Sequence, residues 1–137
     1  MKKILSVTAA LLAALLLLTA CRGEALPEGM DEETLFHAGK DVMLLLVDGE
    51  YEAVHEMLRE DQRELFTAED IADVVASQLD DAGEYKQIDG HMTTGQTING
   101  ERYGIAVLYC DFSKEDVLFR LSFDAQWNLV GFSLDQQ

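Results

Sequence analysis

The sequence predicts an α+β domain in which three helices pack on one face of a four-stranded, antiparallel, curved sheet. Between about residues 32 and 83, apolar side chains recur every three or four positions, the spacing of an amphipathic helix. From Glu84 onward the spacing changes to two, as in a strand with one buried face. Helices that precede the strands, rather than alternate with them, favour an antiparallel sheet covered on one side.

Three helices are expected from their start and stop signals. The expected starts lie near residues 32, 51 and 68. The last start is the best marked, because Thr67 and Asp70 have the spacing of a capping box. Gly49 and Gly83 follow the first and third helices and are expected to end them.

Four strands follow, and the strongest signal among them is the dipeptide Asn99-Gly100. The expected strands span residues 85–97, 101–112, 117–124 and 129–134. Asn-Gly between two alternating runs is typical of a two-residue type I′ hairpin. The remaining strands are joined by short turns, so the sheet is expected to be a simple meander.

The alternation also predicts which side chains share a face. A four-residue turn would pair Phe112 with Val117, which places Cys110 opposite Phe119 on the inner face. The expected inward residues of the last strand are Val130, Phe132 and Leu134. The outward set of the second strand is unusually apolar for a solvent-facing surface and forms a candidate interaction face: Tyr103, Ile105, Val107 and Tyr109.

The first twenty residues have the pattern of a secretory signal peptide. Lys2 and Lys3 precede an apolar run that ends at Leu18. The exit Leu18-Thr19-Ala20-Cys21 resembles the lipobox of bacterial lipoproteins, in which the cysteine carries the lipid. The resemblance implies a signal peptide over 1–20, a lipidated N-terminus and tether over 21–31, and a folded domain over 32–137. The expected location is therefore extracytoplasmic, with the lipid on Cys21 anchoring the protein to the bacterial cell membrane.

The charge of the chain excludes one class of partner. The sequence has 10 basic and 26 acidic residues, and removal of the leader with Lys2 and Lys3 leaves 8 against 26, a net charge of −18. Such a surface repels nucleic acid and anionic lipid headgroups. We therefore expect no nucleic-acid partner, and attachment to the membrane through the lipid alone.

Several segments resemble a known family. They are Gly49-Glu50-Tyr51, the helix start Thr67 to Ile71, Gly83-Glu84-Tyr85, and Val130-Gly131-Phe132 in the last strand. Over residues 34–134 the chain is similar to a bacterial domain of unknown function with the nuclear transport factor 2-like (cystatin-like) fold, which often occurs on secreted lipoproteins. The resemblance implies a cone-shaped sheet packed against helices. It implies no catalytic residues.

Metal and nucleophile motifs are incomplete in this sequence. His55 begins a zinc-protease-like run, but the second histidine is replaced by Arg59. Cys110 is expected to be a buried core residue, because no cation near it in the sequence would activate the thiol. Neither a metal site nor a cofactor is expected.

The position of His91 separates two functional hypotheses. A strict two-residue turn places Asp89 and His91 on the inner face, where they could act as an oriented base. A bulge at Gly90, Gly95 or Gly104 would instead turn Ile88 and Met92 inward and leave His91 outside. Burial of the two apolar side chains favours the bulge.

These observations predict a non-catalytic module that binds a small ligand or a protein. The alternatives are a pocket enzyme, an isomerase or hydrolase that uses Asp89 and His91, and a pure assembly domain. An assembly domain would form a homodimer, or bind an envelope protein, through the apolar outward face.

Overall fold

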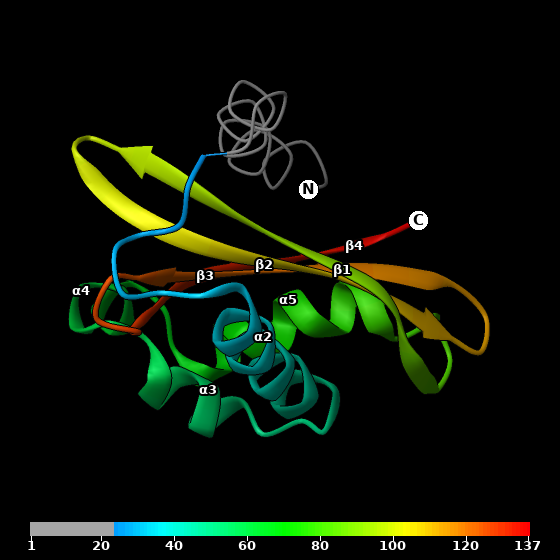
Figure 1. Cartoon of the computed structure of the whole chain (residues 1–137). Coiled ribbons are helices and arrows are strands. Elements are labelled where there is room, and N and C mark those ends of the chain that lie inside the picture. Colours follow the sequence, from blue (N-terminus) through cyan, green and yellow to red (C-terminus); the bar gives the residue numbers. More distant parts are fainter. Residues whose placement is uncertain (1–23) are drawn as a thin grey trace.

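The computed structural model describes residues 24–137 and shows an α+β fold (Figure 1). The helices are α2 (Glu32–Val47), α3 (Tyr51–Met57), α4 (Glu60–Leu65) and α5 (Ala68–Leu79). The strands are β1 (Tyr85–Ile98), β2 (Glu101–Phe112), β3 (Asp116–Asp124) and β4 (Leu129–Gln136). The predicted signal peptide and the lipid attachment at Cys21 lie outside the described residues.

The four strands form one antiparallel, curved sheet in the order β1-β2-β3-β4, as predicted. Helices α2, α3 and α5 lie together on one side of it (Figure 1). We call the sheet face that packs on α2 and α5 the inner face, and the opposite one the outer face. The main core lies between the inner face and the helices and includes the fully buried Val42, Met43, Leu108, Phe119 and Leu121.

Side chains cap two helix starts, and the second of these caps was predicted. The side chain of Asp31 accepts a hydrogen bond from the backbone N–H of Thr34 at 2.8 Å, and hydrogen bonding to the Thr34 side chain and then to its backbone lowers the pKa of Asp31. At the start of α5, Thr67 and Asp70 form the full capping box, with bonds of 3.1 and 2.9 Å. Both caps satisfy backbone donors that the first helical turn leaves free.

The structure contains one short helix, α4, that the sequence did not predict. It follows Arg59, whose backbone is extended, and none of its six residues is buried. A helix without a buried stripe has no apolar periodicity to detect. The expectation of three helices was therefore wrong in number, although the other three were placed correctly.

The register between β2 and β3 differs from the predicted one by two residues. Cys110 lies opposite Val117 rather than Phe119, and Leu108 lies opposite Phe119. A shift of two residues preserves which face each side chain occupies, so the inner-face prediction for Cys110 still holds. The hydrophobic pattern fixes the face, whereas the turn fixes the register.

β4 starts with an irregularity that changes one predicted core residue. The register shifts between Ser122 and Phe123, so that Leu129 lies opposite Phe123 and is fully buried. Val130, which was expected to face inward, is only half-buried. Phe132 and Leu134 keep their predicted places, opposite Leu121 and Phe119.

A bulge is present in β1, and it lies between Ile88 and Gly90. Asp89 is the extra residue and is exposed. Ile88 lies opposite Cys110 and packs against the main core, as the bulge hypothesis predicted.

The same hypothesis was right that His91 is exposed, but wrong about the faces of His91 and Met92. His91 lies opposite Leu108 on the side of the inner face, and Met92 lies on the outer face, where it is 44% exposed. The reason is the position of the bulge. It lies farther from the Asn99-Gly100 turn than either residue, so both keep the register that the turn sets.

Residues 24–30, expected to be part of a tether, instead pack against the sheet. Glu24 pairs with Gly95 of β1 through a 3.1 Å backbone hydrogen bond, and its carboxylate accepts a bond from Thr97 at 3.0 Å. Farther along, Met30 is buried against Gly104. We call residues 24–30 the strap. Glycine is required at 95, because a Cβ there would lie 2.0 Å from the carbonyl oxygen of Ala25.

Across residues 24–137, the helices are too short or too polar for any of them to cross a membrane.

Candidate binding groove on the outer face of the sheet

The predicted interaction face lies on the outer face of β2, but it is less open than the sequence suggested. Ile105 and Val107 are 2% and 8% exposed and form a small separate cluster with Leu118 of β3. Tyr109 is 41% exposed, and its hydroxyl lies 3.8 Å from the sulfur of Met92. The open apolar surface is therefore the Met92–Tyr109 pair, while Ile105 and Val107 are covered within the monomer.

Beside this cluster, a groove of about 160 Å³ crosses the outer face of all four strands. Arg59 and Gln62, from the segment around the start of α4, also line this groove. The strands contribute both apolar and polar side chains, among them Gln96, Ile98, Ile105, Arg120, Ser122 and Val130. The segment reaches this edge because the backbone N–H of Arg59 donates a 2.8 Å bond to the carbonyl of Leu129, at the start of β4.

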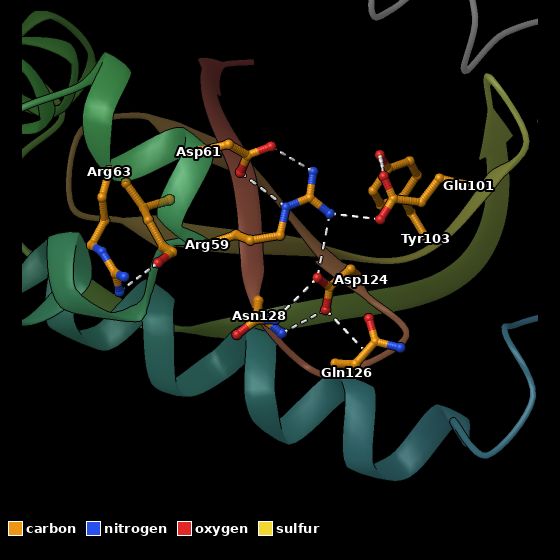
Figure 2. A network of polar contacts seen from close by, with 9 residues as sticks. Arg59, Asp61, Arg63, Glu101, Tyr103, Asp124, Gln126 and Asn128 are labelled. Atoms are coloured by element: carbon orange, nitrogen blue, oxygen red, sulfur yellow. Dashed lines mark hydrogen bonds and ion pairs between the residues drawn. The ribbon is translucent and has the colours of Figure 1, made fainter.

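Arg59 is the centre of a polar network at one end of the groove (Figure 2). Its guanidinium donates to both carboxylate oxygens of Asp61, at 2.9 and 3.0 Å, and to Glu101 at 2.6 Å. It also donates to Asp124 at 3.3 Å. The pKa of Arg59 is raised, chiefly by the Asp61 carboxylate, and that of Asp61 is lowered by the same bonds. One guanidinium thus holds three carboxylates from three segments of the chain.

Asp124 links this network to the turn between β3 and β4. Its side chain is 2% exposed. One carboxylate oxygen accepts the backbone N–H groups of Gln126 and Asn128, at 3.0 and 2.8 Å, and the other accepts the Asn128 side-chain amide at 3.1 Å. The turn also places Trp127 at a positive φ of 69°. A buried carboxylate with this many donors fixes both the turn and the Arg59 side chain.

Tyr103 closes the same end of the groove. Its hydroxyl donates to the second carboxylate oxygen of Glu101, so it bonds to a member of the network around Arg59. Burial raises the pKa of Tyr103, and the hydrogen bond to Glu101 raises it further. Tyr103 therefore acts as a neutral donor at neutral pH.

Gln96 is the unusual member of the groove wall. It is 3% exposed, and its Nε2 is the one buried side-chain polar atom between residues 24 and 137 that has no hydrogen-bond partner. It lies opposite Tyr103, on the outer face of β1. A buried donor without an acceptor is costly and rare in folded proteins.

The two residues proposed as a catalytic pair occupy a different place. Asp89 and His91 line an open surface depression at the edge of β1, together with Phe36 and Lys40 of α2. The ring of His91 stacks on Phe36 at a centroid distance of 4.0 Å. His91 thus contacts α2 at the rim of the domain and does not face an enclosed cavity.

Cys110 lies on the inner face, is 1% exposed, and is part of the main core. Burial raises its pKa to about 12, with a smaller contribution from Asp111. Since the thiolate is the reactive form, we expect a bulky thiol reagent at pH 8 to leave Cys110 unmodified in the folded protein and to modify it after denaturation. A Cys21→Ser background makes Cys110 the only thiol. Rapid modification of the native protein would contradict the burial.

The raised pKa of Cys110 also predicts how the free energy of unfolding depends on pH. Above pH 9 the unfolded chain loses the Cys110 proton while the folded chain keeps it. The wild type should therefore lose stability relative to Cys110→Ala between about pH 9 and 12, by at most about 1.4 kcal/mol per pH unit. Urea unfolding of the two proteins across this range measures the difference.

Sequence reasoning found the apolar strip but missed the residues that make the groove. Arg59 was noted only because it breaks a zinc motif, and neither Gln96 nor Asp124 was singled out. A signal was present for Gln96, since it lies in the same outward set of β1 as Ile98 and opposite Tyr103. Within the described part of the chain, no three His, Cys, Asp or Glu side chains are grouped so that they could hold a metal ion.

Comparisons with known proteins show the family. No curated protein matches the sequence. The fold is similar to the NMR structure of a protein from Ruminococcus gnavus ATCC 29149, with a TM-score of 0.70 and 24% identity, over 81% of this chain and 96% of that one. The family described as "Protein of unknown function (DUF3887)" matches residues 40–132, and the chain therefore belongs to this family.

Proposed function

We propose that the protein is a lipid-anchored extracytoplasmic module that binds a ligand in the groove of the outer face and catalyses no reaction. The observation that carries the binding role is Gln96, a buried and unpartnered donor in the wall of that groove. The inner face offers less room, because Leu108, Phe119 and Leu121 are fully buried against the helices. The order of elements is consistent with a nuclear transport factor 2-like fold, whose inner cone is here occupied by core side chains.

The anchor is supported by the Leu18-to-Cys21 pattern, and the strap limits its length. Glu24 is already bonded to β1, so only residues 22 and 23 separate it from Cys21. Three residue steps span at most about 11 Å. A lipid on Cys21 would therefore hold the domain against the membrane surface, and not at the end of a long tether.

We expect Cys21→Ser to abolish labelling by radioactive palmitate and to move the protein from the membrane to the soluble fraction. The reason is that one thiol carries the lipid, and the acidic surface has no affinity of its own for anionic headgroups. Cys110→Ser is the matched control and should leave labelling intact. Equal labelling of Cys21→Ser and the wild type would refute the anchor.

Assembly through the outer face is a second candidate function, favoured by the exposed Met92–Tyr109 pair. Tyr109→Glu tests it, because Tyr109 is open, whereas a charge at the buried Val107 would disturb folding. If the wild type dimerises through this face, Tyr109→Glu should raise the dissociation constant of the dimer about tenfold or more. Sedimentation would then show more monomer for the variant than for the wild type. Glu69→Lys, on the exposed face of α5, is the control for a simple charge change. A wild type that sediments strictly as a monomer would exclude this candidate.

A further inference from the structure

We infer that the groove between α3 and α5, together with an apolar patch beside it, is a docking surface for a basic amphipathic helix of a partner protein. This surface is separate from the outer-face groove, because α3 and α5 lie on the other side of the sheet (Figure 1). Three features carry the inference: exposed apolar side chains, unpaired carboxylates around them, and a surface built from helices alone.

The apolar patch consists of Met57, Leu65 and Phe66, which are 37%, 67% and 47% exposed. They are three of the five large apolar side chains that are exposed between residues 24 and 137. Hydrogen bonds hold the ends of α3 and α4 together here. His55 Nε2 of α3 donates to the Phe66 carbonyl at 2.7 Å, and Arg63 of α4 donates to two carbonyls at the end of α3, at 3.1 and 3.2 Å. Exposed apolar patches with a polar rim are typical of protein interaction sites.

The groove continues from this patch along the start of α5. Its lining residues are Gly49, Glu50, Tyr51, Glu52, Ala68, Glu69 and Ala72. Ala68 follows Phe66 by two residues, so the groove and the patch adjoin. Ala68 and Ala72 lie one turn apart on α5, and their small side chains leave room for the side chains of another helix.

Charge complementarity selects the partner. Between residues 48 and 81 the chain has 12 acidic and 2 basic residues, a net charge of −10. Both cations are already engaged, Arg59 by three carboxylates and Arg63 by backbone carbonyls. The exposed carboxylates that form no ion pair within residues 24–137 are those of Glu50, Glu52, Glu56, Glu60, Glu64 and Glu69. Such a rim attracts a basic segment, whereas it repels anionic lipid headgroups and a second copy of the same surface.

The helical construction of the surface favours a helix as the partner. The interior backbone groups of α3 and α5 are bonded within each helix, so the surface offers no strand edge to which an extended peptide could add. Recognition must then come from side chains. A helix with an apolar stripe flanked by Lys or Arg can cover the patch and place its cations at the carboxylate rim.

The first test uses a leucine–lysine amphipathic peptide of about 14 residues, or roughly four helical turns. The full-length protein is held in phosphatidylcholine nanodiscs, and empty nanodiscs give the background. We expect saturable binding, with backbone amide shifts within residues 49–72. Two matched peptides should bind about tenfold more weakly or worse. One replaces lysine by glutamate, and the other keeps the leucine–lysine composition but lacks the stripe.

The second test removes the apolar patch. Leu65→Ser should weaken peptide binding about tenfold or more and leave the urea midpoint close to that of the wild type, because Leu65 is mostly exposed. Phe66→Ser is a second variant with the same expected loss of binding. Met92→Ser removes a similarly exposed apolar side chain from the outer face and should leave peptide binding unchanged.

The third test removes charge from the groove. The double variant Glu52→Gln and Glu69→Gln neutralises two carboxylates that line it. Glu32→Gln and Glu33→Gln together are the matched control, because they remove the same charge from the first turn of α2 and do not line the groove. We expect the groove variant to weaken peptide binding by a larger factor than the control.

Four outcomes would overturn the docking surface: no binding of the leucine–lysine peptide, equal binding of all three peptides, loss of binding in Met92→Ser but not in Leu65→Ser, and equal effects of the two double charge variants. Broadening of the Leu65 methyl signals by spin-labelled lipid would also overturn it, since the patch would then face the bilayer. None of these outcomes bears on the outer-face groove.

Discussion

Replacing Asp124 by alanine is expected to lower the free energy of unfolding by about 3 kcal/mol, chiefly because it leaves donors of a part-buried turn without their acceptor. The substitution leaves Arg59 without one of its three carboxylates. It also removes the acceptor of three donors in the β3–β4 turn, two backbone N–H groups and the Asn128 amide. Urea unfolding at neutral pH, with the slope compared between variants, measures the change.

Two further variants show whether burial or charge causes the loss. Asp135→Ala breaks the more exposed pair with Arg120, and we expect it to cost about 1 kcal/mol or less. Asp124→Asn keeps an acceptor for the turn but removes the charge that faces Arg59, so its cost should lie between the two. If Asp124→Ala and Asp135→Ala cost the same small amount, the network around Arg59 does not hold this end of the sheet together.

Gly95→Ala should detach the strap and lower the free energy of unfolding by roughly 2–3 kcal/mol, about the value of burying one large apolar side chain. The added Cβ would lie 2.0 Å from the Ala25 carbonyl oxygen, a backbone atom that cannot move without breaking the Glu24–Gly95 pairing. Release of the strap exposes Pro27 and Met30. Backbone hydrogen exchange should therefore become faster over residues 24–35, and urea unfolding measures the loss of stability.

Gly90→Ala is the control on the same strand. A Cβ at Gly90 would meet only a ring carbon of Tyr109, at an ordinary 3.8 Å, so this variant should be neutral or slightly stabilising. Neither glycine has a positive φ, so the contact alone distinguishes them. Unchanged exchange of the strap in Gly95→Ala would show that it is held by other contacts.

The sequence by itself determined the class of fold and the face of most side chains. Capping residues such as Thr67 and Asp70, and the Asn99-Gly100 turn, act within a few residues of chain, so their effects can be predicted from local sequence. The period-two pattern likewise assigned Cys110 to the core and the apolar strip to the outer face. These signals depend on backbone geometry that is the same in any protein.

Only the tertiary structure decided the register, the position of the bulge and the groove. A shift of two residues between β2 and β3 leaves the hydrophobic pattern intact, so the pattern cannot detect it. The bulge at Asp89 and the exposure of Met92 depend on how β1 pairs with β2 at a distance from the Asn99-Gly100 turn. Arg59, Glu101 and Asp124 are far apart in sequence, and Gln96 is unusual only because no group between residues 24 and 137 accepts a hydrogen bond from its Nε2. Such contacts arise from packing between distant segments, which no local pattern encodes.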